Sequence, residues 1–568
     1  MSGWRRSAAA GLLLLAIYVG LSFLNSPRGF LGTDTGGKVA TMKVMTERGR
    51  FDPDLGYWAE EWDPDGSLHP IGYTSHTASG KWVNVTTLPA LWVGWQLYRV
   101  GGYRASLLVP MAGAVAACFA GLALLRRLGV GERHAWHGFW LLGLASPLTI
   151  YALDFWEHTL GVALMAWAIV LLVDVVVRRR RTPLLGGALA GLLFGAAATM
   201  RTESLVYLAV AGLAAPLIYA TFGSPGGSKR AQMAGGGVIG AAMAAGALLP
   251  LGLNELLERD VVGATVRASR VAGTALGFGQ DASGRLREAM VTVLALEGTS
   301  VGIFFGVLLV AVLIYAASRR DTGVAVAAVV GGAGVVVVRF VIGGLGFVPG
   351  LGPAWMTAVA AAGGLGRRRR GRLAHAADAD AAAAAARLVA AIAVVALPIV
   401  VATQFRGGAG PQWGGRYLLV SGFLLTVLGW AALTERPRPV RVGFASLAAG
   451  VTAMGLVWLA VRSHAVDGTI ADLERRPEPV LVSDVYFLAR EGGATYAVKR
   501  WLTLSPAPDA RPADAANVLT DAGVDRFAAV ALVGERPLMF PGFEPVDADH
   551  LRLFDGVDLR VTTWSRTG

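Results

Sequence analysis

Polar residues that could do chemistry stand at four short segments of the sequence, each beside a long apolar run. The first of them is Asp34, which follows the first apolar run and lies among Gly32, Gly36 and Gly37. A carboxylate at the end of an apolar run could stand in a groove at the membrane surface and take a proton from an acceptor hydroxyl. Aspartate also caps helices well, so Asp34 could instead cap a helix that begins near Gly36. The sequence leaves both interpretations open.

The second segment brings Asp154, Glu157 and His158 within about one helical turn of one another. These residue types could ligate a divalent cation, or orient one that is bound to phosphate. The alternative is that the two carboxylates favour a helix N-terminus through its dipole, with His158 as a hydrogen-bonding side chain. This segment has no HxxH or HExxH spacing, which favours the alternative and leaves the cation as an open prediction.

The third segment contains Arg201 and Glu203, which stand between two short apolar runs. An arginine at that depth is costly if it faces lipid, so it should meet a carboxylate or a bound phosphate. A contact between Arg201 and Glu203 themselves is the alternative, although residues two apart on a helix do not face each other.

The fourth segment is rich in glycine and contains Trp413, Arg416 and Tyr417. Glycine lets the backbone approach a ligand closely, and the three side chains supply a stacking face, a charged fork and a hydroxyl. Together they suit a phosphate or a sugar. The alternative is an aromatic belt at the membrane interface with Arg416 extended toward water, but the glycines and the arginine exceed what such a belt requires.

The composition identifies the setting of these segments as a membrane. The chain has 568 residues, of which 54% are hydrophobic and 16% charged, and its mean hydropathy is +0.53. These values exclude a cytosolic enzyme and a single-span receptor, because apolar runs recur through most of the length. The net charge of +12 reflects basic cytoplasmic loops, and we expect no nucleic-acid partner. The single cysteine, Cys118, excludes an intrachain disulfide and a cysteine-based metal site.

About thirteen runs are long enough to cross a bilayer, for which roughly 20 apolar residues are needed. Their approximate limits are 8–24, 104–125, 135–151, 158–177, 184–200, 203–221, 232–253, 291–316, 322–342, 345–365, 386–403, 415–434 and 441–461. Clusters of lysine and arginine occur at every second connection, which by the positive-inside rule is cytoplasmic. The rule predicts a multi-pass protein of the cell membrane with a cytoplasmic N-terminus, an extracytoplasmic C-terminus and outward-facing polar segments.

The predicted fold class is therefore mainly α, a polytopic membrane helix bundle with a small soluble domain of α/β type at the C-terminus. We expect a membrane domain over residues 1–462, with a long outward first loop at 25–103. Residues 463–568 are rich in proline and aspartate, with short alternating apolar stretches, and should form the extracytoplasmic α/β domain.

Several of these features occur in a characteristic order along the chain. They are Asp34 after the first span, Lys81 with Leu88 and Pro89 before the second, Ser146 and Pro147 before the acidic segment at Asp154 and Glu157, then Arg201 with Glu203, and finally Gly414 to Leu418. The order resembles the GT-C superfamily of polyprenyl-phosphate-dependent glycosyltransferases. The most similar branch contains the protein O-mannosyltransferases and the bacterial aminoarabinose transferase of lipid A.

The resemblance implies roles for individual residues. It makes Asp34 the general base, and places Lys81, Arg201 and Arg416 near the donor phosphate. Many members have two adjacent acids in the first loop, whereas Thr35 follows Asp34 here, which leaves the metal requirement open. The remaining candidates are cavity or metal-site residues, Asp154, Glu157 and His158, and sugar or acceptor contacts, His76, Glu203, Trp413 and Tyr417.

The expected function is transfer of a sugar from a polyprenyl-phosphate donor in the bilayer to a hydroxyl of a cell-envelope glycan, lipid or protein, with inversion through a single displacement. The sequence has no Walker A motif and no GxGxxG after a strand, so we expect no nucleotide cofactor. The alternative is a non-catalytic flippase or exporter of lipid or polysaccharide. In a transporter we would expect broken membrane spans with ionisable groups near the midplane of the bilayer. The acidic residues here lie instead at the outward ends of the spans, which favours the enzyme.

Overall fold

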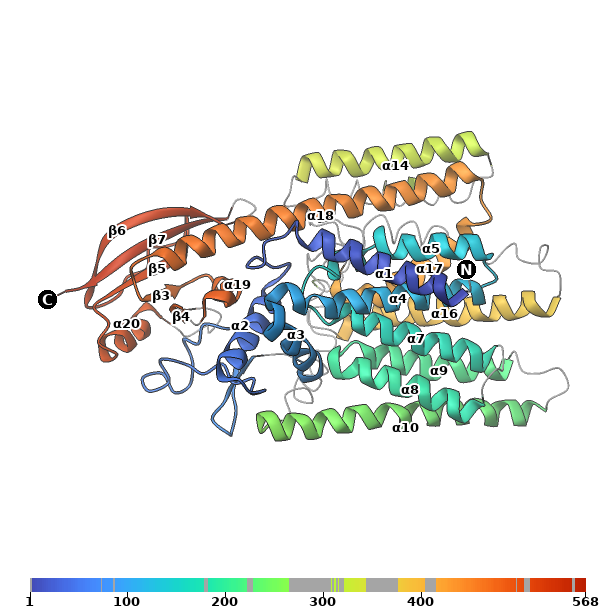
Figure 1. Ribbon diagram of the computed structural model, residues 1–568, viewed down its shortest axis with the longest axis horizontal. Coiled ribbons are helices and arrows are strands. Elements are labelled where there is room, and N and C mark those ends of the chain that lie inside the picture. The colour runs from blue at the N-terminus through green and yellow to red at the C-terminus, as the bar shows by residue number, and fades with distance from the viewer. Residues whose placement is uncertain are drawn as a thin grey trace. The chain divides into compact units, whose positions relative to one another are not determined.

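A computed structural model describes most of the chain, and Figure 1 shows it as ribbons. The described ranges are 3–72, 74–84, 87–177, 182–221, 228–264, 284, 308, 311–312, 315, 321–343, 376–403, 415–496, 498–504, 511–553 and 557–567. The predicted spans at 291–316 and 345–365 lie outside them, apart from single positions in the first. Contacts within the chain define two compact units. A helical unit comprises Met1–Val19, Val109–Asn254 and Arg267–Leu456, and a loop–tail unit comprises Gly20–Leu108, Glu255–Val266 and Val457–Gly568.

Long apolar helices dominate the helical unit. The helices that contribute to it are α1 (Gly3–Ser22), α4 (Leu108–Arg127), α5 (Glu132–Leu144), α6 (Pro147–Tyr151), α7 (His158–Val176), α8 (Pro183–Met200), α9 (Ser204–Thr221), α10 (Lys229–Val262), α14 (Thr322–Gly343), α16 (Ala376–Thr403), the short 3₁₀ helix η4 (Arg416–Leu418), α17 (Leu419–Leu433) and α18 (Arg438–Arg475). Within the described residues, nine helices are long and apolar enough to cross a membrane, and each coincides with a predicted span. The mainly helical, multi-pass class is thereby confirmed.

Residues 135–151 differ from the prediction, because they form two helices where one continuous span was expected. Helix α5 ends at Leu144 and α6 begins at Pro147. Proline has no N–H to donate and disfavours helical backbone in the residue before it. Ser146 accordingly has an extended backbone, and its side chain accepts a hydrogen bond from the N–H of Leu148 at 3.2 Å. The break leads directly into the acidic segment that follows α6.

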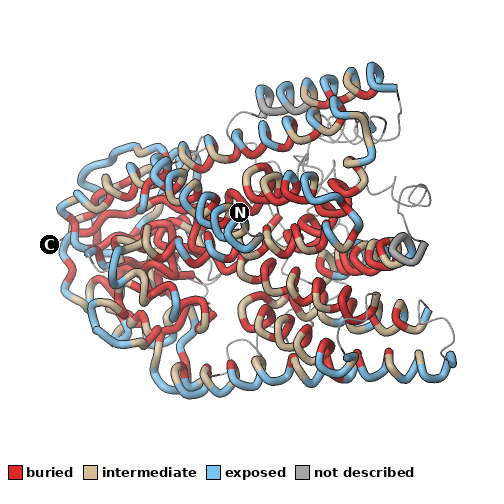
Figure 2. Tube along the Cα trace, turned by 45° about the vertical axis from the view of Figure 1, so that its right-hand side comes forward, coloured by how far each residue is buried: buried red, intermediate tan, exposed pale blue. Residues whose placement is uncertain are grey.

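Burial separates the central helices from the peripheral ones (Figure 2). In the most apolar window of each helix, 78% of α7 and 83% of α17 are buried, against 28% for both α9 and α10. The exposed side chains of α10 are nevertheless apolar, for example Leu248 at 67% and Leu256 at 64% exposure. Apolar side chains that remain exposed on helices of this length are those that a bilayer covers. Helices α7 and α17 therefore form the interior that can carry buried charge.

The tail contains the small α/β domain that the sequence predicted. Its five-stranded sheet has the order β4-β3-β5-β7-β6. The strands are β3 (Val480–Ser483), β4 (Arg500–Thr503), β5 (Arg526–Leu532), β6 (Phe543–Arg552) and β7 (Asp558–Arg566), with β3, β4 and β5 parallel and β5, β6 and β7 antiparallel. The short helices are α19 (Leu488–Glu491), the 3₁₀ turn η5 (Gly493–Thr495) and α20 (Pro512–Asp521).

The first loop folds together with this tail. It forms α2 (Thr33–Arg48), a hairpin of β1 (Thr74–His76) and β2 (Trp82–Asn84), and α3 (Leu88–Ser106). Tyr57, Leu68 and Trp82 of the loop share one apolar core with strands β3, β4 and β5 of the tail. The backbone N–H of Thr503 in β4 also donates to the carbonyl of Leu68 at 2.9 Å. Because apolar area buried between two segments stabilises both, the loop and the tail form one folded body.

A buried histidine makes the stability of this body depend on pH. Burial lowers the pKa of His69 from 6.5 to about 4, and its Nδ1 accepts a hydrogen bond from the N–H of Ile71 at 3.2 Å. Native His69 therefore stays neutral while the unfolded chain takes up a proton. The contribution of neutral His69 to the free energy of unfolding should be fully present above pH 6.5. It should fall by up to about 3 kcal/mol as the pH drops toward 4. Thermal unfolding at several pH values measures this, and the His69→Asn variant should show a flatter dependence. An equally steep dependence in the variant would contradict it.

Candidate functional site

Arg201 lies in the break between α8 and α9, and there it meets two carboxylates. Its backbone is extended, with φ −134° and ψ 119°, so Arg201 and Glu203 do not follow each other on one helix. This is why side chains two residues apart can meet: Nε of Arg201 lies 2.8 Å from Oε1 of Glu203. Glu157, just before α7, lies 3.5 Å from Nη1 of the same guanidinium. The ion pair between Arg201 and Glu203, given above as the alternative, is present in the structure.

Two arginines from distant parts of the chain lie against one tyrosine ring. The guanidinium carbon of Arg201 lies 5.0 Å from the ring centre of Tyr417, and that of Arg416 lies 5.1 Å from it. Arg416 also lies 5.5 Å from the ring centre of Trp156. Gly415, with φ 58°, makes the turn that starts η4, a conformation that glycine adopts without strain. Cations within about 6 Å of such rings are attracted to their faces, so the rings hold both guanidinium groups in place.

The acidic segment beside this cluster is built from stacked rings and an ion pair. The ring of His158 lies 5.1 Å from that of Tyr151 and 4.7 Å from that of Trp156, while Glu157 faces Arg201. Asp154 is buried, with 1% exposure. In the described part of the chain, no group of three histidine, cysteine, aspartate or glutamate side chains is placed to hold a metal ion. The cation site at Asp154, Glu157 and His158 stays a prediction.

Tyr151 and Trp156 are residues of this site that the sequence argument did not single out. Trp156 stands between the two carboxylates that drew attention, and an aromatic residue inside an acidic segment beside a span was the available signal. Both rings are buried, with 0% exposure for Tyr151 and 2% for Trp156. Trp413, which was predicted to contact the sugar or the acceptor, lies outside the described residues.

Asp34 belongs to the loop–tail unit and lies in the first turn of α2. The helix begins at Thr33 with Gly32 as its N-cap residue, so Asp34 lies inside the helix and the interpretation of Asp34 as a cap near Gly36 is wrong. The Oδ1 atom of Asp34 accepts a hydrogen bond of 2.8 Å from Nη2 of Arg490 in α19. The side chain of Asp34 is 34% exposed and that of Arg490 is 2% exposed. No local pattern in the sequence pointed to Arg490.

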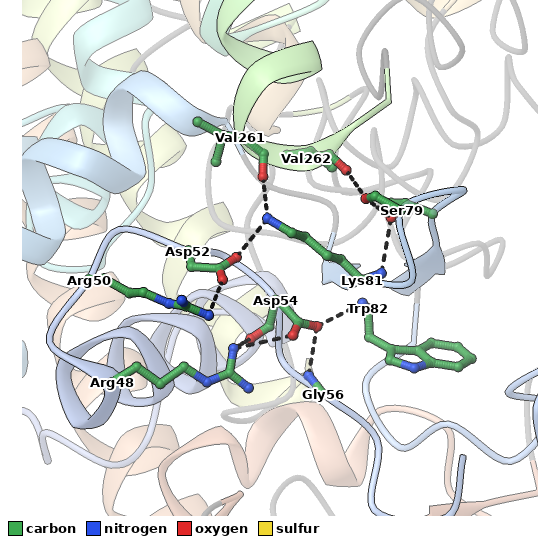
Figure 3. A network of polar contacts seen from close by, with 11 residues as sticks. Arg48, Arg50, Asp52, Asp54, Gly56, Ser79, Lys81, Trp82, Val261 and Val262 are labelled. Carbon is green, nitrogen blue, oxygen red and sulfur yellow. Dashed lines mark hydrogen bonds and ion pairs between the residues drawn. The ribbon is translucent and has the colours of Figure 1, made fainter. Parts of the chain in front are cut away.

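Lys81, predicted near the donor phosphate, holds the end of a helix (Figure 3). Its Nζ lies 3.2 Å from Oδ1 of Asp52 and donates to the carbonyl of Val261 at 2.7 Å. Ser79 donates to the next carbonyl, that of Val262, at 2.9 Å. The last carbonyls of a helix have no partner within the helix, and a cation there interacts favourably with the helix dipole. Lys81 and Ser79 thus complete the C-terminus of α10, and the phosphate role of Lys81 stays a prediction.

His76, predicted to contact the sugar or the acceptor, stacks on the ring of Trp82. The ring centres are 4.2 Å apart and the planes differ by 3°. Its Nε2 lies 3.5 Å from Oε1 of Glu60, and its side chain is 35% exposed. The stacking holds the imidazole flat against the loop, with its polar edge toward Glu60.

A multi-pass helical membrane protein with a compact loop–tail unit is the class that this architecture defines. The chain aligns with solved structures along most of its length, at low sequence identity. It is similar to the archaeal oligosaccharyltransferase AglB from Archaeoglobus fulgidus in complex with an inhibitory peptide and a dolichol-phosphate, with a TM-score of 0.44, 13% identity, and coverage of 91% of this chain and 69% of that chain. It is also similar to ArnT from Cupriavidus metallidurans bound to undecaprenyl phosphate, with a TM-score of 0.40, 13% identity, and coverage of 99% and 98%. No protein-family model matches the chain, and no curated protein sequence matches it either.

Proposed function

We propose that the protein is a membrane glycosyltransferase that moves a sugar from a polyprenyl-phosphate donor to a hydroxyl of a glycan, lipid or protein on the outer face of the cell membrane. The observation that carries the proposal is the pair of guanidinium groups, Arg201 and Arg416, held against the ring of Tyr417. Guanidinium groups at the ends of apolar helices suit a phosphate, because their planar forks match its oxygens.

The two arginines have unequal shares in this role. Arg201 is buried and already faces the carboxylates of Glu157 and Glu203, so much of its charge is balanced within the protein. Arg416 begins η4, directly after the turn at Gly415, and its guanidinium lies on the rings of Trp156 and Tyr417. We therefore assign the main phosphate contact to Arg416, and to Arg201 the task of holding Tyr417 in position. The roles of Lys81, His76, Glu203, Trp413 and Tyr417 toward the donor or acceptor remain predictions.

The proposed reaction is a single displacement at the anomeric carbon. Asp34 takes the proton of the acceptor hydroxyl as the acceptor oxygen forms its bond to the anomeric carbon. The bond from that carbon to the phosphate oxygen breaks, and the polyprenyl phosphate leaves with the electron pair. Arg416 stabilises the negative charge that develops on the phosphate. One displacement inverts the configuration at the anomeric carbon, and no step requires a metal ion or a nucleotide.

The test uses the full-length protein in lipid nanodiscs and a panel of sugar-labelled polyprenyl phosphates. We expect labelled sugar to reach a hydroxyl acceptor from at least one donor. The Arg416→Gln variant should bind that donor about 10- to 100-fold more weakly, because a hydrogen bond to a charged group contributes about 1.5–3 kcal/mol. The matched control is Arg511→Gln in the tail, whose side chain is 77% exposed.

Two results would remove the proposal. One is the absence of sugar transfer from every donor in the panel. The other is Arg416→Gln protein that binds the donor as tightly as the Arg511→Gln control, which would remove the phosphate assignment. Movement of labelled lipid across sealed vesicles without sugar transfer would instead support the flippase or exporter.

A further inference from the structure

We infer that Arg490, a residue of the C-terminal tail, is a positioning residue for the Asp34 carboxylate, so that the tail completes the base site in the first loop. The inference rests on the proposed function of Asp34. It extends that function by giving the tail a part in the transfer reaction, beyond a part in binding an acceptor.

The geometry of the contact is that of a fixed clamp. One guanidinium group donates from Nη2 to Oδ1 of Asp34 at 2.8 Å and from Nη1 to Oγ1 of Thr33 at 3.3 Å. The guanidinium group of Arg490 therefore contacts two successive residues of the first turn of α2. Its side chain is 2% exposed, whereas that of Asp34 is 34% exposed. The cation is buried on one side of the pair and the carboxylate reaches solvent on the other, which is the arrangement that a base for an incoming hydroxyl requires.

The backbones of α2 and α19 are close enough to keep the clamp in register. A Cβ on Gly36 would lie 1.6 Å from the carbonyl oxygen of Arg490, and a Cβ on Gly493 would lie 2.0 Å from the carbonyl oxygen of Gly36. Only glycine fits at either position without a shift of the main chain. Lys43, further along α2, donates to the carbonyl of Ala494 at 2.9 Å. The position of Arg490 is thus fixed by close packing of the main chains on either side of it, and not by its side chain alone.

Other charged side chains lie near the pair of Arg490 and Asp34. Glu491, with a side-chain exposure of 1%, could compete for the guanidinium, but it is paired with Arg462 of α18. Arg462 also donates from Nη1 to the carbonyl of Phe30 at 2.5 Å, just before α2. On α2 itself, Lys38 is one turn beyond Asp34 and is buried, with 5% exposure. Removing one partner of a buried pair is strongly unfavourable, so Glu491 should keep Arg462 as its partner.

The clamp has two consequences for a base. It fixes the orientation of the carboxylate, and proton transfer is faster when the base is held in the right geometry. It also places a positive charge beside the carboxylate, which favours the ionised form. Without Arg490, Asp34 should hold its proton at higher pH and should be less available as a base.

The experiment compares Arg490→Gln and Arg490→Lys with the unaltered full chain in sugar transfer. We expect Arg490→Gln to lower kcat about 10- to 100-fold, to leave KM for the donor unchanged, and to move the acid limb of the pH–rate profile up by about 1 pH unit or more. Arg490→Lys keeps the charge and should restore the acid limb without restoring all of kcat. The matched control is Arg476→Gln, which breaks another ion pair of the tail, that with Asp549, and should leave the acid limb in place.

A second measurement separates the failure of this inference from the failure of the proposed function. Thermal unfolding of Asp34→Asn, Arg490→Gln and the double variant forms a cycle that does not depend on activity. Melting shifts that do not add support the contact, and additive shifts overturn it. If the unaltered protein transfers sugar but Arg490→Gln keeps its kcat and acid limb, the inference is overturned while the proposed function stands. If the unaltered protein transfers no sugar from any donor, the proposed function fails and with it the role of Arg490 as a positioning residue.

Discussion

The Asp34→Asn variant is expected to transfer sugar about 10²- to 10⁴-fold more slowly than the unaltered protein while it still binds the donor. The amide keeps the size of the carboxylate and one oxygen that can accept from Arg490, so the fold of α2 should persist. It cannot take a proton from the acceptor hydroxyl at neutral pH. The measurement is single-turnover transfer of a labelled sugar, together with a separate titration of donor binding.

Asp65→Asn is the matched control for this result. Asp65 lies in the same first loop and is exposed. Its variant should transfer sugar at the rate of the unaltered protein. Equal rates for Asp34→Asn and Asp65→Asn would remove Asp34 as the base, while loss of donor binding in Asp34→Asn would give it a binding role.

The second large effect concerns stability, and it arises at Arg201. The Arg201→Met variant should lose about 3–5 kcal/mol in free energy of unfolding, because it leaves buried carboxylates without their cation. Glu203 is 4% and Glu157 is 9% exposed at the side chain. Thermal unfolding in one detergent measures the change. Changing Glu203 to Gln as well should recover part of the loss, because it removes one of the unpaired charges.

Arg259→Met is the control for Arg201→Met. Arg259 forms an exposed i,i+4 pair with Glu255 and has 65% side-chain exposure, so its loss should change stability by no more than about 0.5 kcal/mol. Similar melting shifts for both variants would show that burial does not strengthen the pairing at Arg201.

The membrane spans could be predicted from the sequence because the signal is local. A window of about 20 apolar residues is both necessary and readable, and the tail could be recognised from its change in composition. The break at Ser146 was readable as well, since Pro147 marks it, but the apolar run on both sides favoured one span. The ion pair between Arg201 and Glu203 was considered for the same local reason. The spacing of the two residues did not show that the backbone of Arg201 is extended, which is what lets the two side chains meet.

The contact between Asp34 and Arg490 could not be predicted from the sequence. Asp34 and Arg490 are separated by 456 positions, and no periodicity or motif connects them. The acidic segment shows how packing adds partners that spacing does not reveal. Asp154, Glu157 and His158 have metal-ligand chemistry and close spacing, but the tertiary structure directs Glu157 to Arg201 and stacks His158 on aromatic rings. Residue type and spacing suggest a site, and packing decides which partner each side chain takes.

The shared core of the first loop and the tail limits how this protein can be divided or recombined. The sequence predicted the tail as a separate domain. In the structure, strand β4 lies at the edge of the tail's sheet and is covered by the first loop, where the carbonyl of Leu68 accepts a hydrogen bond from the N–H of Thr503. Released alone, the tail would present an open edge and the uncovered side of its apolar core, features that promote pairing with other chains. A chimera that exchanges the tail without the first loop inherits the same defect. The two segments, more than 350 residues apart in the chain, therefore form a single unit of exchange.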